Sequence, residues 1–206
     1  MGEVRRPGRP RDTTADRAIL EATRDLVIEK GYARLSMEGV AARTGVGKPT
    51  VYRRWPSKGA LVADALRHNI LTTAPGHSAE PPDTGDIEND LRIWHREYAR
   101  VTADPRNVPL LLALTAAAAE NPDDAEVLYR QLAGPQHQAL TERLRSAVDA
   151  GDLRADTDLE AVADALIGAL LYQLLTGNAA AAGQRAAALL DILLAGLHTP
   201  PTSRQT

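Results

Sequence analysis

The sequence predicts an all-helical protein with a small N-terminal domain and a larger C-terminal one. Apolar residues recur three and four positions apart along most of the 206 residues, and no stretch shows the period of two that a strand requires. Charge also divides the chain: residues 1–70 hold 14 Lys and Arg against 8 Asp and Glu, whereas residues 71–206 hold 10 against 19. We therefore expect only the basic first part to meet a polyanion such as nucleic acid.

Composition argues against several classes of protein. The chain has no cysteine, so disulfides, thiol catalysis and cysteine-ligated metals are excluded. Its start lacks the apolar run of a signal peptide, and its most apolar window, residues 161–175, is too short to span a bilayer. The five histidines lack metal-ligand spacing, and no nucleophile, phosphate loop or pair of acid–base carboxylates is evident. We expect a cytoplasmic protein that is not an enzyme and has no cofactor, metal or membrane partner.

Residues 1–12 are expected to form a disordered basic arm, because their prolines prevent a helix. The triplet Gly8-Arg9-Pro10 resembles the core of an AT-hook, which lays arginine along a narrow minor groove where the potential is most negative. We therefore predict that Arg9 contacts DNA. A solvated tail without function is the alternative.

Residues 36–58 predict two short helices joined by a tight turn. Ser36 can cap the first helix, and Gly45 can close it in a left-handed conformation. Pro49 suits the first turn of the second helix, where its missing N–H costs nothing. This pattern is typical of a helix-turn-helix, whose second helix enters the major groove of DNA.

A helix on each side of this motif completes the expected N-terminal domain, residues 13–70. The first runs over about residues 15–30, has one apolar face and ends at Gly31. The other begins after Ser57, a good cap, and should continue to about residue 71. It leads out of the domain and therefore connects the two halves of the chain.

The motif and its surroundings carry a specific set of residues: Ala41-Ala42, Gly45-Val46, Thr50-Val51-Tyr52, Trp55, Ser57-Lys58 and Leu61. With these residues the domain resembles the DNA-binding domain of the TetR family of bacterial repressors. Two positions depart from the family pattern, since Trp55 stands where phenylalanine is usual and Gly47 where a capping serine is common. Both residues preserve the fold, although Gly47 offers no hydroxyl to a phosphate.

The second helix of the motif should supply most of the DNA contacts. Side chains at its start reach base edges, its proline can press on a thymine methyl, and its arginines can read guanine or hold phosphate. The family resemblance places its tyrosine at the DNA. The contacts expected from this helix are Lys48, Pro49, Thr50, Tyr52, Arg53 and Arg54. Nearby helix ends should add three phosphate clamps, Tyr32, Ser36 and Lys58.

Residues 71–206 are expected to form the second helical domain. A mobile loop rich in proline and glycine, residues 72–85, precedes helices at about 87–103 and 109–120. The tetrapeptide Asn121-Pro122-Asp123-Asp124 signals the next helix start, with a cap, a proline and carboxylates at the positive end of the helix dipole. That helix should run to about residue 150, with a kink at Gly134-Pro135.

The last two helices, expected from a Thr157–Glu160 capping box to residue 176 and over about 180–197, are apolar nearly all round. Covering both sides of such a helix is difficult at the end of one chain, so we predict a homodimer. In the TetR family this pair of helices makes a four-helix dimer interface. Two fully internal helices of a monomer are the alternative. The expected interface residues are Leu166, Leu170, Leu174, Leu190, Leu193 and Leu197.

Aromatic residues and histidines gather in the middle helices, where aliphatic stretches could surround a small organic effector. Ordinary packing and surface exposure are the alternative for each residue alone. The expected pocket residues are Trp94, His95, Tyr98, Leu112, Tyr129 and His137.

These observations together predict a TetR-like transcriptional repressor, a homodimer that binds a palindromic operator in double-stranded DNA and is released by a small organic effector. A ligand-independent architectural DNA-binding protein is the second interpretation, suggested by the basic arm. An enzyme built on the C-terminal half is a third, which the absence of a catalytic constellation disfavours.

Overall fold

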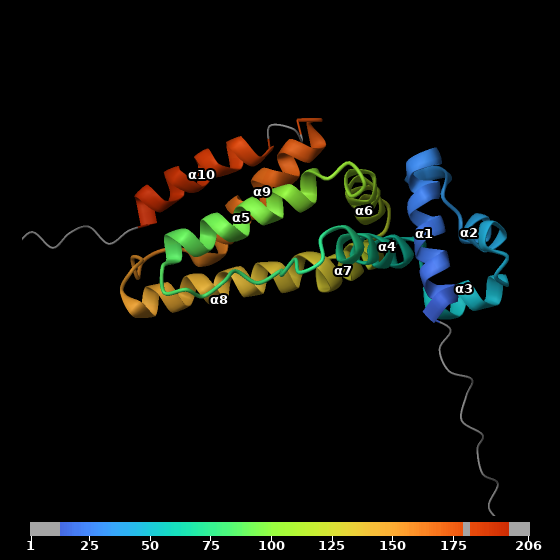
Figure 1. Cartoon of the computed structure of the whole chain (residues 1–206), viewed down its shortest axis with the longest axis horizontal. Coiled ribbons are helices and arrows are strands. Elements are labelled where there is room, and N and C mark those ends of the chain that lie inside the picture. The colour runs from blue at the N-terminus through green and yellow to red at the C-terminus, as the bar shows by residue number, and fades with distance from the viewer. Residues whose placement is uncertain (1–12, 179–181, 198–206) are drawn as a thin grey trace, which may run out of the picture.

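The computed structural model describes residues 13–178 and 182–197, and every regular element in these ranges is a helix, which confirms the predicted fold class. The expected arm, with Arg9, lies outside the described residues. The described chain is elongated (Figure 1): helices α1 to α3 form one end, and α5, α8, α9 and α10 extend to the other. Among the described residues, no helix is long and apolar enough to cross a membrane.

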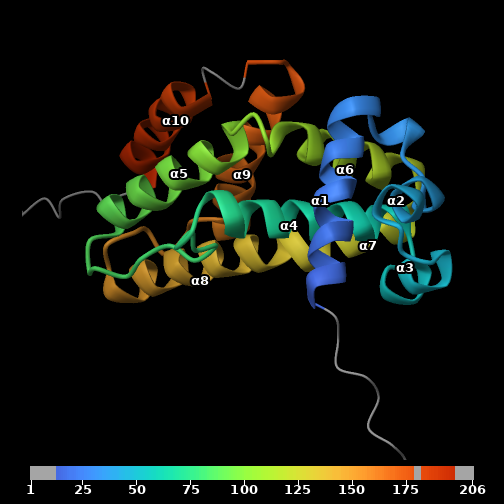
Figure 2. The same ribbon diagram turned by 45° about the vertical axis from the view of Figure 1, so that its right-hand side comes forward.

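The basic end contains α1 (Thr13–Lys30), a short 3₁₀ helix η1 (Tyr32–Arg34), α2 (Met37–Thr44) and α3 (Lys48–Arg54). From there α4 (Lys58–Thr73) runs into the rest of the molecule, packed against α1, α6 and α7 (Figure 1; Figure 2).

One apolar core, built around α4, joins the basic end to α6 of the acidic part. Leu61, Val62 and Leu66 of α4 are fully buried between α1 on one side and Leu110 and Leu114 of α6 on the other. The expected domain boundary near residue 70 stays a prediction, but the core crosses it. A movement of α4 must therefore involve both halves.

The acidic part consists of the following helices: α5 (Ile87–Ala103), α6 (Val108–Glu120), α7 (Pro122–Leu128), η2 (Tyr129–Ala133), α8 (Gly134–Ala150), α9 (Leu159–Leu175) and α10 (Ala182–Leu197). A second core lies among α5, α8, α9 and α10, with Leu91, Leu140, Leu144 and Leu166 fully buried.

The kink expected at Gly134-Pro135 is a short π-helix, η2, between α7 and α8. Proline lacks an N–H and clashes with the carbonyl four residues earlier, so a regular α-turn cannot pass through Pro135. A wider π-turn is one way to accommodate it. Gly134 permits this turn, because a Cβ at that position would lie 2.9 Å from the carbonyl oxygen of Tyr129.

The loop before α5, which the sequence suggested to be mobile, is anchored by hydrogen bonds to α5 and α8. The buried carboxylate of Asp90 accepts hydrogen bonds from Arg143 on α8 at 2.6 Å and from the Thr84 hydroxyl at 2.7 Å. Trp94 adds an indole bond to the Ala79 carbonyl at 2.9 Å. The loop is thereby held over α5 and α8.

The start of α9 differs from the expected capping box by one residue. Asp158, and not Thr157, caps the helix, since its carboxylate accepts from the backbone N–H of Ala161 at 3.1 Å. Both residues are good caps, and the choice between adjacent ones depends on where the chain enters the helix.

The leucines expected at a dimer interface point into the protomer, which corrects that prediction. Leu193 is partly buried against the second core, and the others are fully covered by the same chain: Leu166, Leu170, Leu174, Leu190 and Leu197. A helix that is apolar all round does not reveal from its sequence which side faces inward. The opposite side of α9 and α10 stays exposed, and its apolar residues include Tyr172 at 60%, Leu175 at 57% and Ile192 at 70% exposure.

Candidate DNA-binding surface and ligand cavity

The turn between α2 and α3 is built by local interactions that the sequence encodes. Ser36 caps α2 by accepting from the Gly39 N–H at 3.1 Å, and Gly45 ends it with φ of 68°. Gly47 occupies the cap position of α3 without a side-chain bond, and Pro49 lies in its first turn. The expected helix-turn-helix is therefore present.

Three contacts fix α3 against the domain. Val51 is fully buried, and the indole N–H of Trp55 donates to Asp64 of α4 at 2.9 Å. Arg54 forms an ion pair with Asp16 of α1, and its side chain is only 14% exposed. Arg54 was expected to contact DNA, but the structure uses it to join α3 to α1, because its position on the helix faces inward.

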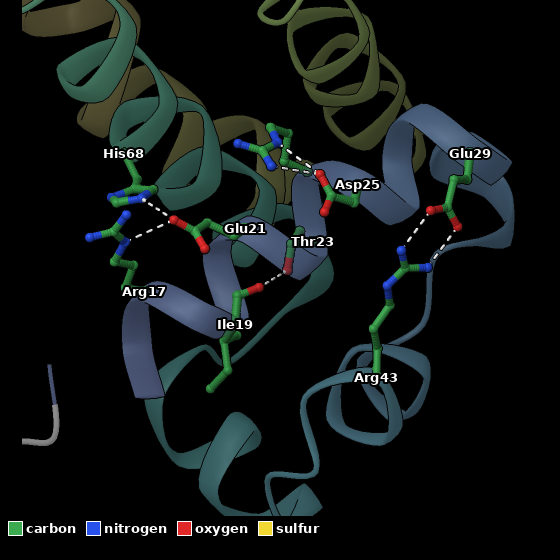
Figure 3. A network of polar contacts seen from close by, with 9 residues as sticks. Arg17, Ile19, Glu21, Thr23, Asp25, Glu29, Arg43 and His68 are labelled. Carbon is green, nitrogen blue, oxygen red and sulfur yellow. Dashed lines mark hydrogen bonds and ion pairs between the residues drawn. The ribbon is translucent and has the colours of Figure 1, made fainter. Parts of the chain in front are cut away.

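Polar contacts of α1 hold the neighbouring helices in place (Figure 3). Glu29 near the end of α1 receives two bonds of 2.7 Å from Arg43 of α2. Glu21 receives a bond from Arg17 at 2.8 Å and lies 3.9 Å from His68 of α4. Helix α3, the second helix of the motif and hereafter the recognition helix, is thus supported by the connected helices α1, α2 and α4.

The outward side of α3 carries most of the residues expected at DNA. Lys48, Pro49, Tyr52 and Arg53 are exposed, as is the capping residue Ser36, and Thr50 is half-buried. Within residues 13–178 and 182–197 no helix covers these exposed side chains, so a DNA groove can approach them. Among the described residues nearby, Arg34 of η1 is a further exposed cation that the sequence reasoning did not include.

Glu38 of α2 engages the tyrosine at the centre of this surface. The Tyr52 hydroxyl donates to its carboxylate at 2.8 Å. This bond lowers the pKa of Glu38 and raises that of Tyr52, so the phenol is neutral and the carboxylate charged. Sequence reasoning missed Glu38, because the two residues are 14 positions apart and belong to different helices.

Tyr32 and Lys58 form a stacked pair at the start of α4. The Lys58 ammonium lies 3.8 Å from the centre of the Tyr32 ring and donates to the Tyr32 carbonyl at 3.3 Å. Tyr32 is buried, and its pKa is raised to about 12 by burial first and then by the charges of Asp124 and Glu120. Tyr32 is therefore a packing residue and not the phosphate clamp that we expected.

An apolar cavity of about 360 Å³ lies beside α4 in the acidic part. This volume falls within the range of small-molecule sites. Its walls come from α4, α5, α6, η2, α8, α9 and the anchored loop. The apolar lining includes Leu66, Ile70, Leu71, Val101, Leu111, Leu114, Leu132, Ile167 and Leu171.

The polar groups of this cavity are largely neutral. Burial lowers the pKa of His77, an effect that nearby Glu97 opposes, and burial raises the pKa of Tyr98 to about 12. Imidazole and phenol are therefore both uncharged near pH 7. Arg67 carries a formal charge at the rim and donates to Asp64 at 3.0 Å.

Of the expected pocket residues, Tyr98 lines the cavity and the other five do not. Trp94 stacks behind Tyr98, with ring centres 5.2 Å apart, and His95 is buried against the Leu166 carbonyl at 3.2 Å. Leu112 is on the outward side of α6. Tyr129 and His137 belong to a separate open groove lined mainly by polar and charged residues. The helical period orients these side chains away from the cavity, and aromatic composition alone does not show that orientation.

Two family models match the chain. One, described as bacterial regulatory proteins of the tetR family, covers residues 19–65. The other, described as a tetracyclin repressor-like C-terminal domain, covers residues 81–193, which is more than half of the chain. The first match includes the helix-turn-helix, and the second includes most of the cavity.

Relatives with these features are similar along most of their length. The uncharacterized HTH-type transcriptional regulator YdeS of Bacillus subtilis is 30% identical over 83% of this chain and 84% of its own. The DNA-binding transcriptional repressor TetR of Mycobacteroides abscessus is 30% identical over 82% and 86%, respectively. The crystal structure of the TetR family transcription regulator SCO0332 is 32% identical, with a TM-score of 0.63 over 86% of this chain and 97% of that one. This chain belongs to the TetR family of bacterial transcriptional regulators.

Proposed function

We propose that this regulator represses transcription as a homodimer on a palindromic operator and is released when a small, neutral, mostly apolar molecule enters the cavity beside α4. The observation that carries this proposal is the double role of α4. Its residues Leu66 and Ile70 line the cavity, while its first turn, at Lys58, adjoins the recognition helix. The 30% identity to a protein named as a transcriptional repressor supports the repressing role.

The exposed side of α9 and α10 supports the homodimer. We call it the outer face and define it by Gly168, Tyr172, Leu175, Ala188, Ile192 and Ala195. Large exposed apolar residues next to small ones allow two helices of a second copy to approach closely, and a two-fold axis pairs the same face of both copies. Two recognition helices would then read half-sites about one helical turn, ~34–36 Å, or a small multiple of it, apart.

The chemistry of the cavity supports a neutral ligand. An anion would need a buried cation, and the lining cation Arg67 pairs with Asp64 at the rim. His77 and Tyr98 offer neutral hydrogen-bonding groups on an apolar wall. Such a ligand changes DNA affinity only if it binds the released state better than the DNA-bound state, with a coupling of typically 1–3 kcal/mol.

The test begins with the operator. Purified full-length protein is used to select and footprint genomic DNA, and we expect one or a few palindromic sites. A thermal-shift screen of neutral aromatic and aliphatic compounds follows, and each hit is titrated with and without the operator. We expect each hit to lower the affinity of the protein for the operator, and the operator to lower the affinity for that hit by the same factor.

Two neighbouring residues of α6 provide a matched control for the cavity. Leu111 lines it, whereas Leu112 points outward. Leu111→Trp should fill the cavity and abolish the hits, while Leu112→Trp should retain them. Compounds whose binding is abolished by Leu111→Trp, but which leave the operator affinity of the wild-type protein unchanged, would contradict the proposed release. Binding spread over DNA without a preferred palindrome would favour an architectural protein.

A further inference from the structure

A buried carboxylate joins the acidic part to the start of α4. Asp124 in the first turn of α7 is 7% exposed, and its Oδ1 accepts a hydrogen bond from the Ser57 hydroxyl. Ser57 is also the cap of α4, because its oxygen accepts from the Ala60 N–H at 3.0 Å. The charges at the start of α7 were expected to favour the helix dipole, but exposed Asp123 can serve that purpose and Asp124 is turned inward.

Gly59 makes room for this carboxylate. A Cβ at Gly59 would lie 2.6 Å from Oδ1 and 2.8 Å from Cβ of Asp124, closer than side-chain atoms pack. Glycine within an α-helix costs roughly 0.5–1 kcal/mol relative to alanine. The close approach of Asp124 is therefore the structural reason for glycine at this position.

The other end of the same short segment forms part of the cavity wall. Helix α7 continues directly into η2, whose residues Gln131, Leu132 and Ala133 line the cavity. Less than three turns of helix thus separate a cavity wall from the residue that holds the cap of α4. A ligand that displaces η2 would also displace Asp124, because the short helix α7 that joins them is rigid and transmits displacement along its axis.

We propose that Asp124 is a positioning residue that couples the cavity to the DNA-binding end by holding Ser57 and Gly59 at the first turn of α4. Displacement of η2 withdraws the carboxylate, frees the first turn of α4 and changes the orientation of the adjacent recognition helix. The consequence for DNA rests on the proposed function, but the contact and its effect on α4 do not.

Hydrogen exchange of the full-length protein tests the contact without DNA or ligand. In Asp124→Ala, amides in the first turn of α4 and in α3 should lose protection by roughly tenfold or more, the scale of a lost hydrogen bond to a charged group. Asp123→Ala removes the same charge from the same turn and should leave them unchanged. Asp124→Asn keeps an acceptor for Ser57 and should restore most of the protection. Equal protection in Asp124→Ala and Asp123→Ala would overturn the proposal.

Gly59→Ala provides a second variant, for which the proposal and a purely local role of Gly59 predict opposite changes in protection. If Gly59 mattered only for helix propensity, alanine would stabilise the start of α4. If Asp124 needs the space, alanine should reduce protection there. Increased protection in Gly59→Ala would argue against the contact, even if either variant proved less stable overall.

Coupling to the cavity is measured by a double-mutant cycle on DNA binding. Ala133→Leu adds bulk at a cavity-lining position of η2 and should weaken binding to duplexes selected by the wild-type protein. In the Asp124→Ala background the same change should have a much smaller effect. Equal effects in both backgrounds would refute the coupling while leaving the regulator function intact. If the wild-type protein selected no DNA duplex at all, the proposed function would be refuted, and the hydrogen-exchange result would remain valid.

Discussion

At the scale of single residues, Tyr52 is the residue that we most expect to contact DNA, and its hydroxyl is engaged by Glu38. The phenol is exposed on α3 but donates a hydrogen bond to a carboxylate of α2. A DNA phosphate near this pair would meet a negative charge, and the hydroxyl would have to exchange partners. Glu38 therefore opposes binding while it orients the tyrosine.

We expect Glu38→Gln to raise DNA affinity several-fold at low salt, because it removes a charge that repels phosphate. Tyr52→Ala should lower affinity roughly tenfold, the scale of one lost contact. Fluorescence anisotropy with a selected duplex measures both. Glu126→Gln, which makes the same change of net charge on α7, should have no effect, and an equal gain there would show that only net charge matters.

We expect His77 to make stability and ligand binding sensitive to acid. Its folded pKa lies below the unfolded value of about 6.5, because burial disfavours the imidazolium. The unfolded chain therefore binds more protons as the pH falls through that value, and the free energy of unfolding decreases. His95, whose pKa burial also lowers, acts in the same direction.

His77→Gln should flatten the fall of the thermal midpoint between about pH 7.5 and pH 5.5, and His95 should account for part of the remainder. Protonation of His77 also places a charge on the cavity wall, so apolar ligands should bind the wild-type protein less well at the lower pH. Calorimetric scans across this range provide the measurement. An unchanged pH profile in the variant would show that His77 is not the sensitive group.

At the scale of elements, one short segment with special geometry lies beside the cavity. The π-helix η2 follows α7 and precedes α8, and it forms part of the cavity wall. This π-helix forms because Pro135 has no N–H for a regular α-helical hydrogen bond, and because Gly134 tolerates the close approach of the Tyr129 carbonyl. The shape of this cavity wall therefore depends on Gly134 and Pro135.

Gly134→Ala should destabilise the protein, although alanine favours helices, because the new Cβ would contact the Tyr129 carbonyl. We expect a decrease of roughly 1–3 kcal/mol, the scale of overpacking at a tight site. Gly183→Ala in α10, where a Cβ meets no atom within 4 Å, should be neutral or stabilising. Urea unfolding of both variants gives the comparison, and a stabilised Gly134→Ala would contradict the role assigned to η2.

At the scale of the whole molecule, we expect two copies to assemble through the outer face of α9 and α10. The buried leucines of these helices complete the core of one protomer, and the exposed residues remain for a partner. A stable dimer of this kind needs roughly 2,000 Å² of buried surface or more, which an area formed by two helices from each copy can supply.

Two substitutions within one turn of α9 distinguish the faces. Tyr172→Asp should produce a folded monomer with weak operator binding, because it places a charge on the outer face. Leu170→Asp should unfold the protein, because it buries an unpaired charge in the core. Sedimentation velocity and circular dichroism separate the outcomes, and a wild-type protein that is monomeric at micromolar concentration would refute the dimer.

The sequence by itself determined the features that depend on near neighbours. Helical periodicity predicted the fold class, and Ser36, Gly45 and Pro49 predicted the turn of the DNA-binding motif. These signals are reliable because caps, left-handed closures and first-turn prolines involve residues only a few positions apart.

Only the tertiary structure decided which sides of the helices face each other. It placed the interface leucines inside the protomer, paired Arg54 with Asp16, and formed the cavity around Tyr98 while leaving the other expected residues outside it. The contact between Ser57 and Asp124 joins residues 67 positions apart. Such contacts are set by the packing of many side chains at once, and a helix that is apolar on every side carries no local signal for its orientation.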